Sequence, residues 1–258
     1  VHFVALDNID YLGHENGGSY YRGYLNETML AWVRNNLQYV DKDKMLVFLA
    51  HIPLYSMDTD ARSNNTVNRT ELLELLEDRD RILFLCGHRH MIFHHFLDEE
   101  FGRMNKNPIH HISVAAAAGG WWRGPKTNYG IPVSTQNDGT PNGYHIFHFD
   151  GNTYRERYKA AGLDPGYQMR IEAPNNILAK EDVRKTKLIV NVFNGNRNSD
   201  VRFRINGDSE WHKMERQVSY KSPFLSKTGW INSMDTNHIW LSELPDLERG
   251  ANKIIIWV

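Results

Sequence analysis

Three histidines follow two apolar stretches at points where buried strands would end. Residues 81–86 form one apolar run, with His88 and His90 just after it, and residues 45–50 form another that stops at His51. The carboxyl ends of parallel strands meet at one edge of a sheet, so we expect the three imidazoles to converge there. Neutral imidazole is a common ligand of zinc, manganese and iron. The sequence therefore predicts a divalent-metal site formed by His51, His88 and His90.

The spacing of His88 and His90 is by itself a weak signal for metal binding. The chain contains 13 histidines, and the adjacent pairs at 94–95 and 110–111 show that close pairs also arise elsewhere. The prediction gains weight because a second, separate apolar run ends on His51.

Alternating strands and helices are expected to position these histidines. Residues 1–6, 45–50 and 81–86 have the continuous apolar composition of buried parallel strands. Two segments with helical spacing lie between them, one beginning after a capping Asn26 and the other covering residues 70–77. This order indicates an α/β unit with the histidines at the carboxyl edge of its sheet.

The other stretches of this half predict loops, strands and a hairpin. Residues 13–24 are rich in Gly and Tyr without periodicity and predict a surface loop, and the polar residues 56–68 predict a loop that borders the histidines. Residues 91–97 and 110–117 predict two strands, and residues 150–151, Asp-Gly, predict the turn of a hairpin.

Several short motifs resemble a known enzyme family. Residues 50–55 (Ala-His-Ile-Pro-Leu-Tyr) and residues 87–90 (Gly-His-Arg-His) are similar to the second half of a calcineurin-like metallophosphoesterase. Residues 121–124 and 138–144 resemble a bacterial branch of that family that carries an added C-terminal β domain.

The resemblance implies a centre of two divalent metal ions, Mn, Zn or Fe, that hydrolyses a phosphoric ester. In such a centre His51 and His88 would bind the second ion and His90 the first. Phosphomonoesters, phosphodiesters and nucleotides all remain open as substrates.

The first half of that family's metal centre has no counterpart in this sequence. The family supplies a D-x-H turn, a G-D-x-x-D turn with a bridging aspartate, and a G-N-H turn with an acidic histidine. Asp7, Asp10 and the His14-Glu15 pair are the candidates in residues 1–50, and none has the required spacing. We therefore expect an incomplete site, with no general acid or bridging carboxylate, in a fragment that is inactive alone and whose partner is the missing N-terminal half.

Trp121, Trp122 and Arg123 form a second candidate site. Two adjacent indoles cannot both face inward from an extended backbone, so at least one is expected to be exposed or to line a cleft. Arginine binds phosphate through paired hydrogen bonds. The triplet therefore predicts either substrate contact or packing between domains.

The last hundred residues lose helical periodicity. Strand patterns at 188–193, 200–205, 238–241 and 253–258 alternate with turn residues and predict a β-sandwich. The fold class expected for the whole chain is an α/β (α+β) metallophosphoesterase-like partial sandwich followed by a mainly antiparallel β-sandwich. The expected domains are residues 1–158 and 159–258.

Two other functions fit the same residues. The chain could be a β module that binds a carbohydrate or a protein partner through its tryptophans, with vestigial histidines. Alternatively, His51, His88 and His90 could bind a single zinc ion with an open water position, as in mononuclear zinc hydrolases. The latter requires all three imidazoles to reach one ion.

Composition excludes some partners. The 30 basic and 31 acidic residues leave a net charge of -1, which provides no field for binding nucleic acid or a membrane surface. No apolar run approaches the roughly 20 residues that span a bilayer.

Cys86 is the single cysteine, so no internal disulfide can form. We expect it to be a small buried apolar residue. The cysteine content therefore leaves the cellular compartment open, and a periplasmic or secreted location remains possible. An exposed face or edge of the first sheet would favour self-association.

Overall fold

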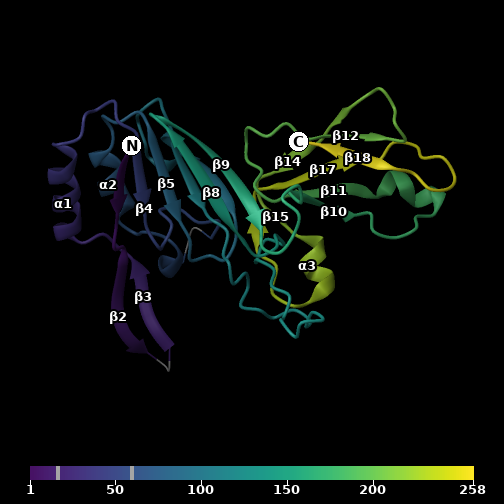
Figure 1. Cartoon of the computed structure of the whole chain (residues 1–258), viewed down its shortest axis with the longest axis horizontal. Helices are drawn as coiled ribbons and strands as arrows, with labels where there is room; N and C mark the ends of the chain where they lie inside the picture. Colours follow the sequence, from purple (N-terminus) through teal and green to yellow (C-terminus); the bar gives the residue numbers. More distant parts are fainter. Residues whose placement is uncertain (16–17, 59–60) are drawn as a thin grey trace. The chain divides into compact units, whose positions relative to one another are not determined.

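The chain divides into two compact units, each built on its own sheets (Figure 1). The structure is a computed structural model that describes residues 1–15, 18–58 and 61–258. Unit 1 comprises Val1–Ala116 and Tyr144–Arg157, and unit 2 comprises Ala117–Gly143 and Tyr158–Val258. The expected domain boundary after residue 158 stays a prediction.

Unit 1 is organised around a five-stranded sheet in the order β1-β4-β5-β7-β6. Its first four members run parallel, and β6 pairs antiparallel with β7. The strands are β1 (His2–Ala5), β4 (Leu46–Leu49), β5 (Ile82–Cys86), β6 (Phe93–Leu97) and β7 (Ile109–Ser113). The prediction that residues 1–6, 45–50 and 81–86 contribute neighbouring parallel strands of one sheet is confirmed.

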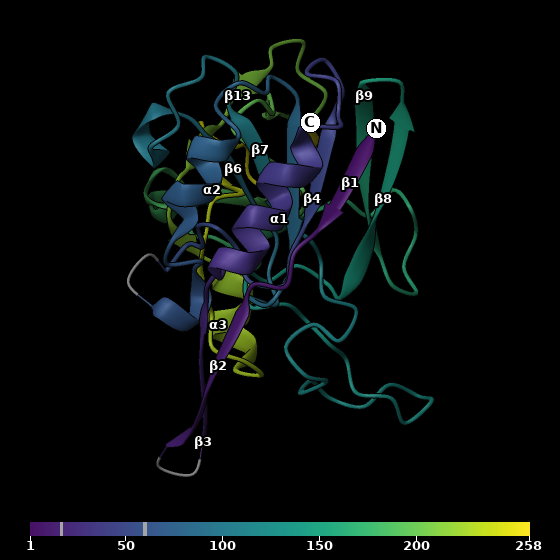
Figure 2. The ribbon, with the colours of Figure 1, turned by 90° about the vertical axis from the view of Figure 1, so that its left-hand side faces the viewer.

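Two helices, α1 (Glu27–Leu37) and α2 (Arg69–Leu75), cover one face of this sheet (Figure 2). The Oδ1 atom of Asn26 accepts a hydrogen bond from the amide of Met29 at 2.8 Å, which confirms the predicted N-cap. Val33 of α1 is fully buried in the same apolar cluster as Phe48 and Phe84 of the sheet. Burial of this apolar stripe is what fixes the helix on the strands.

A hairpin of β8 (Gly143–Asp150) and β9 (Thr153–Ala160) covers the opposite face. Phe147, Phe149 and Tyr154 pack against a cluster that includes Val47 and Leu83 of the sheet. The hairpin is a two-stranded sheet of its own, with a predicted tight turn whose glycine has a φ of 55°. Side-chain packing therefore holds it, with no ladder to the five strands.

Residues 13–24 were expected to form a loop, and this expectation is wrong. They belong largely to a hairpin of β2 (Ile9–Glu15) and β3 (Gly18–Gly23). Tyr11 lies opposite Tyr21 in the antiparallel register, and Arg22 pairs with Asp10 at 2.8 Å. Cross-strand aromatic and charged pairs of this kind stabilise a hairpin, and they are not visible as local periodicity. The predicted loop at 56–68 includes the short 3-10 helix η1 (Arg62–Asn64).

Cys86 is buried at the end of β5, as expected. Its Sγ atom donates to the carbonyl oxygen of Ile112 at 3.3 Å, and burial raises the pKa of the thiol well above its usual range. The thiol is therefore protonated and acts as a small apolar core group.

Unit 2 contains two larger antiparallel sheets, ordered β10-β11-β17-β14 and β13-β12-β18, and the pair β15-β16. One apolar cluster draws on both larger sheets, including Val190 of β11, Phe203 of β12 and Trp240 of β17. The four predicted strand regions are confirmed, so the chain is mixed α/β with mostly antiparallel pairing. The elements are β10 (Met169–Ala173), η3 (Lys180–Lys185), β11 (Lys187–Val192), β12 (Arg202–Ile205), β13 (His212–Lys213), β14 (Glu215–Gln217), β15 (Tyr220–Lys221), α3 (Pro223–Thr228), β16 (Asp235–Thr236), β17 (Ile239–Glu243) and β18 (Ile254–Trp257).

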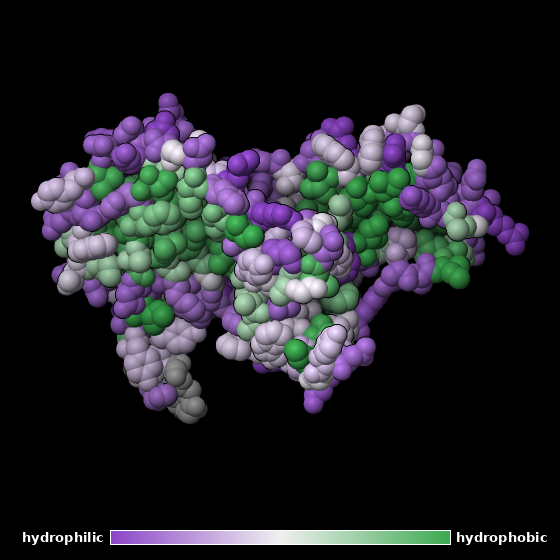
Figure 3. Space-filling model, in the orientation of Figure 1, coloured by the Kyte–Doolittle hydropathy of each residue, from purple (hydrophilic) through white to green (hydrophobic). Residues whose placement is uncertain are grey.

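Some apolar side chains of unit 1 stay on its surface. Phe3, Leu49, Tyr144 and Ile146 are exposed, and Figure 3 shows a broad hydrophobic area on this unit. Such areas favour contacts with other chains, and self-association stays a prediction.

Within the described residues, no helix has both the length and the apolar character needed to cross a membrane.

Candidate functional site

His51 and His88 meet at the carboxyl edge of the five-stranded sheet. The Nε2 atom of His51 lies 3.0 Å from the Nδ1 atom of His88, and their ring centroids are 4.9 Å apart. The two turns are also joined through the backbone, because the amide of Gly87 donates to the carbonyl oxygen of His51 at 3.1 Å. Parallel pairing of β4 with β5 thus places the two strand ends, and their imidazoles, side by side.

The turn after β5 has a left-handed backbone at both histidines. The φ angles of His88 and His90 are 69° and 52°, whereas Gly87 has no positive φ. A left-handed φ costs a non-glycine residue of order 1–3 kcal/mol and persists only where the surroundings impose it. Such residues cluster at functional sites, so the strain supports a role for this turn.

The loop after His51 is held by two side chains from neighbouring strands. The side chain of Asn8, just beyond β1, makes two hydrogen bonds to the backbone of Ile52. Its Nδ2 donates to the carbonyl oxygen at 2.6 Å, and its Oδ1 accepts from the backbone N–H at 3.1 Å. His111 of β7 accepts a bond at Nε2 from the amide of Leu54 at 3.1 Å. Asn8 and His111 are therefore positioning residues, which the sequence patterns did not identify.

Burial and mutual repulsion keep the two imidazoles neutral. Partial burial is the main cause that lowers the pKa of His88 to about 4, and the nearby His51 and Arg89 act in the same direction. Burial, followed by the charge of His90, lowers the pKa of His51 below 6.5. Neutral imidazoles carry free lone pairs at physiological pH, which is the form that binds metal ions.

Polar groups from two other segments border His88. The hydroxyl of Tyr21, on β3, lies 3.5 Å from Nε2 of His88, and the two rings meet edge to face. Arg89, in the same turn, is 4.0 Å from the carboxylate of Asp58. The β2–β3 hairpin thus reaches the site, although the sequence predicted only a loop there.

The donors at this edge fit one ion held by a pair of histidines. Two nitrogens bound to one tetrahedral ion at about 2.0–2.1 Å lie roughly 3.3–3.4 Å apart, close to the observed separation. His90 shares the turn but, within the described ranges, His51, His88 and His90 do not form a group whose ligand atoms all lie within 4.8 Å of one another. This geometry favours the pair over a mononuclear three-histidine site.

A hollow of about 410 Å³ borders the same strand ends. Its lining includes the residues just before the two histidines, Ala50 and Gly87, and the ring of His145, whose Nδ1 accepts from the amide of Ala115 at 3.1 Å. The rest of the lining is mainly apolar: Leu49, Leu85, Cys86, Val114, Tyr144 and Phe147. The hollow offers space beside the histidines for a ligand with an apolar part.

The Trp121-Trp122-Arg123 triplet belongs to unit 2. Both tryptophans are exposed, at 64% and 44%, and both have left-handed backbones with φ of 70° and 56°. The expectation that at least one indole is exposed is confirmed, although the segment is a turn and not extended backbone. Arg123 is exposed as well. The triplet is a surface feature, and its role in substrate contact stays a prediction.

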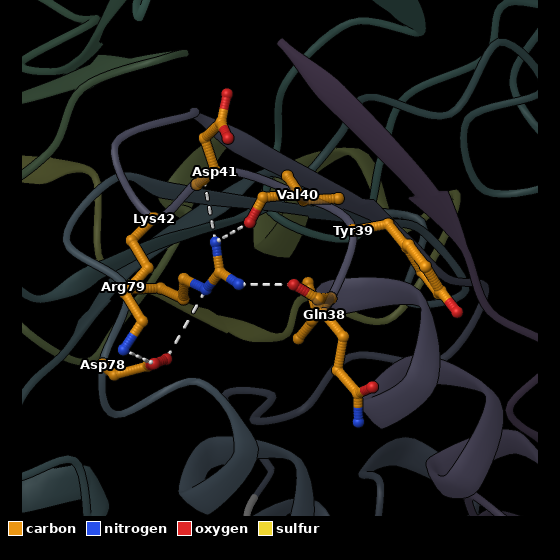
Figure 4. Close-up of a pocket in the computed structure, with 8 residues that line it drawn as sticks. Gln38, Tyr39, Val40, Asp41, Lys42, Asp78 and Arg79 are labelled. Carbon is orange, nitrogen blue, oxygen red and sulfur yellow. Dashed lines mark hydrogen bonds and ion pairs between the residues drawn. The ribbon is translucent and has the colours of Figure 1, made fainter.

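A second hollow, of about 420 Å³, lies near the amino ends of β4 and β5, opposite the histidines (Figure 4). It is lined by residues 37–42, Asp78 and Arg79. The guanidinium of Arg79 donates to the carbonyl oxygens of Leu37, Val40 and Asp41 at 2.7, 2.8 and 2.9 Å. Leu37 is the last residue of α1, and Val40 and Asp41 lie in the turn that follows, so this arginine ties the helix end to that turn and serves the fold.

Replacing Arg79 by methionine is expected to lower the free energy of unfolding of unit 1 by about 2–4 kcal/mol, because one buried and two partly buried hydrogen bonds lose their charged donor. Hydrogen exchange of β4 and β5 amides would measure the loss. The matched control is Arg81→Met: Arg81 is exposed and makes one bond, to the carbonyl oxygen of Asp43, so its loss should cost under about 1 kcal/mol. Equal losses in the two variants would contradict the capping role.

Comparison with known proteins identifies the family. Residues 111–258 match the family model described as the C terminal of calcineurin-like phosphoesterase, which is more than half of the chain. Among solved structures, a dimetal phosphatase from Danio rerio is similar with 16% identity and a TM-score of 0.32, covering 52% of this chain. The chain spans only 38% of that protein. No curated protein matches the chain.

A match over residues 111–258 includes the end of β7, the β8–β9 hairpin and all of the described strands of unit 2. It extends over the 121–124 and 138–144 motifs that carry the resemblance to the branch with an added β domain. The chain belongs to the calcineurin-like phosphoesterase C-terminal family.

Proposed function

We propose that this chain contributes part of the metal centre of a metal-dependent phosphoric ester hydrolase. The observation that carries the proposal is the 3.0 Å approach of His51 and His88, at the carboxyl ends of adjacent parallel strands, in a chain of this family. The left-handed turn at His88 and His90 supports the proposal, since its strain has no other evident use in the fold.

Each residue of the edge has a definite task in this scheme. His51 and His88 would hold one divalent ion (Mn, Zn or Fe) through their neutral nitrogens, and His90 would be a ligand of a second. Asn8 fixes the backbone after His51, and Tyr21 limits how the ring of His88 can turn. Two bound divalent ions would activate the attacking water and neutralise charge that develops on the phosphoryl oxygens.

Carboxylate ligands and a general acid must come from elsewhere in the assembled enzyme. A pair of ions held close together needs a bridging carboxylate, and the leaving oxygen needs a proton donor. The sequence contains none of the family motifs that supply these groups. We therefore expect this chain to bind metal weakly and to hydrolyse phosphoric esters only when a further segment supplies those groups.

Metal titration tests the His51–His88 pair directly. We expect Mn²⁺ binding, measured by electron paramagnetic resonance of the free ion, to weaken by about tenfold or more in His88→Ala, because one imidazole alone is a poor site. The matched control is His148→Ala, which removes an exposed imidazole of the same unit and should leave binding unchanged.

The comparison uses differences between variants, so other metal sites cancel. Identical Mn²⁺ and Zn²⁺ affinities in the intact chain, His51→Ala and His88→Ala would show that the pair does not bind metal. That outcome would leave the proposed function without its supporting residues.

A second proposal concerns unit 2. We propose that it is a β-sandwich whose Trp121, Trp122 and Arg123 contact a ligand with a ring face and an anionic group. The exposure of both indoles supports this role, as does the apolar cluster common to both sheets. A carbohydrate would offer the ring face, and a phosphate ester would offer the anionic group.

A further inference from the structure

A cluster of metal-binding side chains lies apart from His51 and His88, between the five-stranded sheet and the β8–β9 hairpin. His94, His110 and Glu156 each offer one ligand atom, and these atoms all lie within 4.8 Å of one another. The Nδ1 atom of His94 is 2.9 Å from Nε2 of His110 and 3.9 Å from Oε1 of Glu156. Within the described residues, this is the group of three that meets the distance criterion.

Strand register explains why the three side chains meet. In the β6–β7 ladder Phe96 lies opposite His110, so His94, two residues before Phe96, projects from the same face of the sheet. In β9, exposed Arg155 and Arg157 alternate with half-buried Tyr154 and Glu156, which turns the glutamate toward that face. Three strands thus contribute one ligand each.

A neighbouring tyrosine orients one of the histidines. The Nδ1 atom of His110 is hydrogen-bonded to the hydroxyl of Tyr154, which leaves Nε2 directed at His94. Metal-ligating histidines almost always donate their other nitrogen to such a partner, which fixes the tautomer and the ring orientation. Tyr154 also packs in the apolar cluster beneath the hairpin, so its position is constrained.

We propose that His94, His110 and Glu156 bind a divalent transition-metal ion that ties the β8–β9 hairpin to the sheet. This site is separate from the His51–His88 pair and does not depend on the proposed hydrolase function.

The ligand types and burial define the class of ion. Two imidazoles and one carboxylate suit Zn²⁺ or Co²⁺, whereas Ca²⁺ and Mg²⁺ prefer oxygen ligands alone. Ligand atoms on a tetrahedral ion lie about 3.3–3.4 Å apart, and the observed 2.9 and 3.9 Å bracket that value. The side chain of His94 is fully buried and that of Glu156 is 14% exposed, so a bound cation would also offset a charge held away from water.

An ion here would add a link that the backbone lacks. The hairpin forms no ladder with the five strands. Its described attachments are apolar packing, the bond between Tyr154 and His110, and a bond from the amide of Met45, just before β4, to Oδ1 of Asn152 at 3.0 Å. A metal bridge from β9 to β6 and β7 would therefore slow opening of the hairpin more than it affects the rest of unit 1.

The experiment starts from a His51→Ala, His88→Ala double variant of the full 258-residue chain, so that the other candidate pair cannot bind. We expect this variant to bind one equivalent of Zn²⁺ by calorimetry and its melting temperature to rise by about 5–10 °C at a hundredfold excess over Kd. Amides of residues 144–157 should exchange at least about tenfold more slowly with Zn²⁺ than without it. Ca²⁺ should have no effect.

Adding Glu156→Gln to that background should weaken Zn²⁺ binding by about tenfold or more and abolish slower exchange in the hairpin. The matched control Glu99→Gln, at an exposed site of the same unit, should bind as the background does. Absence of Zn²⁺ binding in the background, or unchanged affinity after Glu156→Gln, would overturn the proposal. If Glu156→Gln does not fold, Co²⁺ added to the background decides: intense visible absorption of a tetrahedral ion supports the site, and its absence overturns it.

Discussion

Replacing His88 by alanine is expected to lower metal-dependent phosphodiester hydrolysis by about 100-fold or more, in a chain extended to supply the carboxylate ligands and the general acid. The reason is the pairing of His88 with His51: without it, one imidazole remains on that ion, and the loss of even an outer-shell partner costs 10–100-fold at metal sites. Turnover of a chromogenic phosphodiester with added Mn²⁺ is the measurement.

The 258-residue chain alone gives the complementary result. It should hydrolyse the same ester no faster than its His88→Ala variant, because three imidazoles without a carboxylate do not complete a two-metal centre. His148→Ala in the extended chain is the control and should keep full activity, since that imidazole is exposed. Substantial metal-dependent hydrolysis by the short chain, abolished by His88→Ala, would contradict the scheme and favour the three-histidine zinc site.

The second large effect is expected in unit 2, where a buried histidine–aspartate contact anchors the 138–144 motif. Nε2 of His238 is 3.2 Å from Oδ2 of Asp138, and both side chains are fully buried. Nδ1 of His238 lies 2.9 Å from Oδ1 of Asn191, whose Nδ2 donates to the backbone carbonyl oxygen of Asp138 and to Oε1 of Glu172. Glu172 in turn accepts from the hydroxyl of Ser222 at 2.7 Å.

His238→Ala should lower the free energy of unfolding of unit 2 by about 3–5 kcal/mol, because the buried Asp138 carboxylate loses its hydrogen bond to the imidazole and keeps the one from the amide of Thr140. Urea denaturation followed by hydrogen exchange of β11 and β17 would measure it. The control His212→Ala removes a half-buried histidine that packs on Phe203 and should cost about 1 kcal/mol or less.

A double-mutant cycle with Asp138→Asn separates the pair from its surroundings. Coupling between the two changes should reach about 0.5–3 kcal/mol if they act as one pair. Additive effects, or a loss below about 1 kcal/mol for His238→Ala, would show that the network does not stabilise the unit. The network also gives the 138–144 motif a structural use, independent of any ligand.

Local patterns in the sequence were sufficient for the elements of the first sheet. The apolar runs at 45–50 and 81–86 became adjacent parallel strands, and Asn26 capped α1, because burial and capping depend on residues close together in the chain. The same reasoning predicted that His51 and His88 would meet, since parallel strands bring their carboxyl ends to one edge. The family followed from short motifs around these histidines.

Tertiary structure decided what depends on pairing between distant strands. No local pattern indicated the left-handed angles that the packed turn imposes on His88 and His90. Residues 13–24 gave no periodic signal, yet pairing of Tyr11 with Tyr21 makes them a hairpin that reaches His88. Cross-strand partners contribute free energy only once the strands are aligned, so they leave little trace in a short window.

The two polar clusters illustrate the same limit most clearly. Asp138 and His238 are 100 residues apart, and Glu156 reaches His94 and His110 from a hairpin that no ladder joins to their strands. Alternation along one strand shows on which face of the sheet a side chain lies. Long-range packing of apolar residues decides which other strand covers that face. The sequence by itself therefore determined the family, the strand ends and the His51–His88 pair. Only the fold determined which buried polar groups share a site.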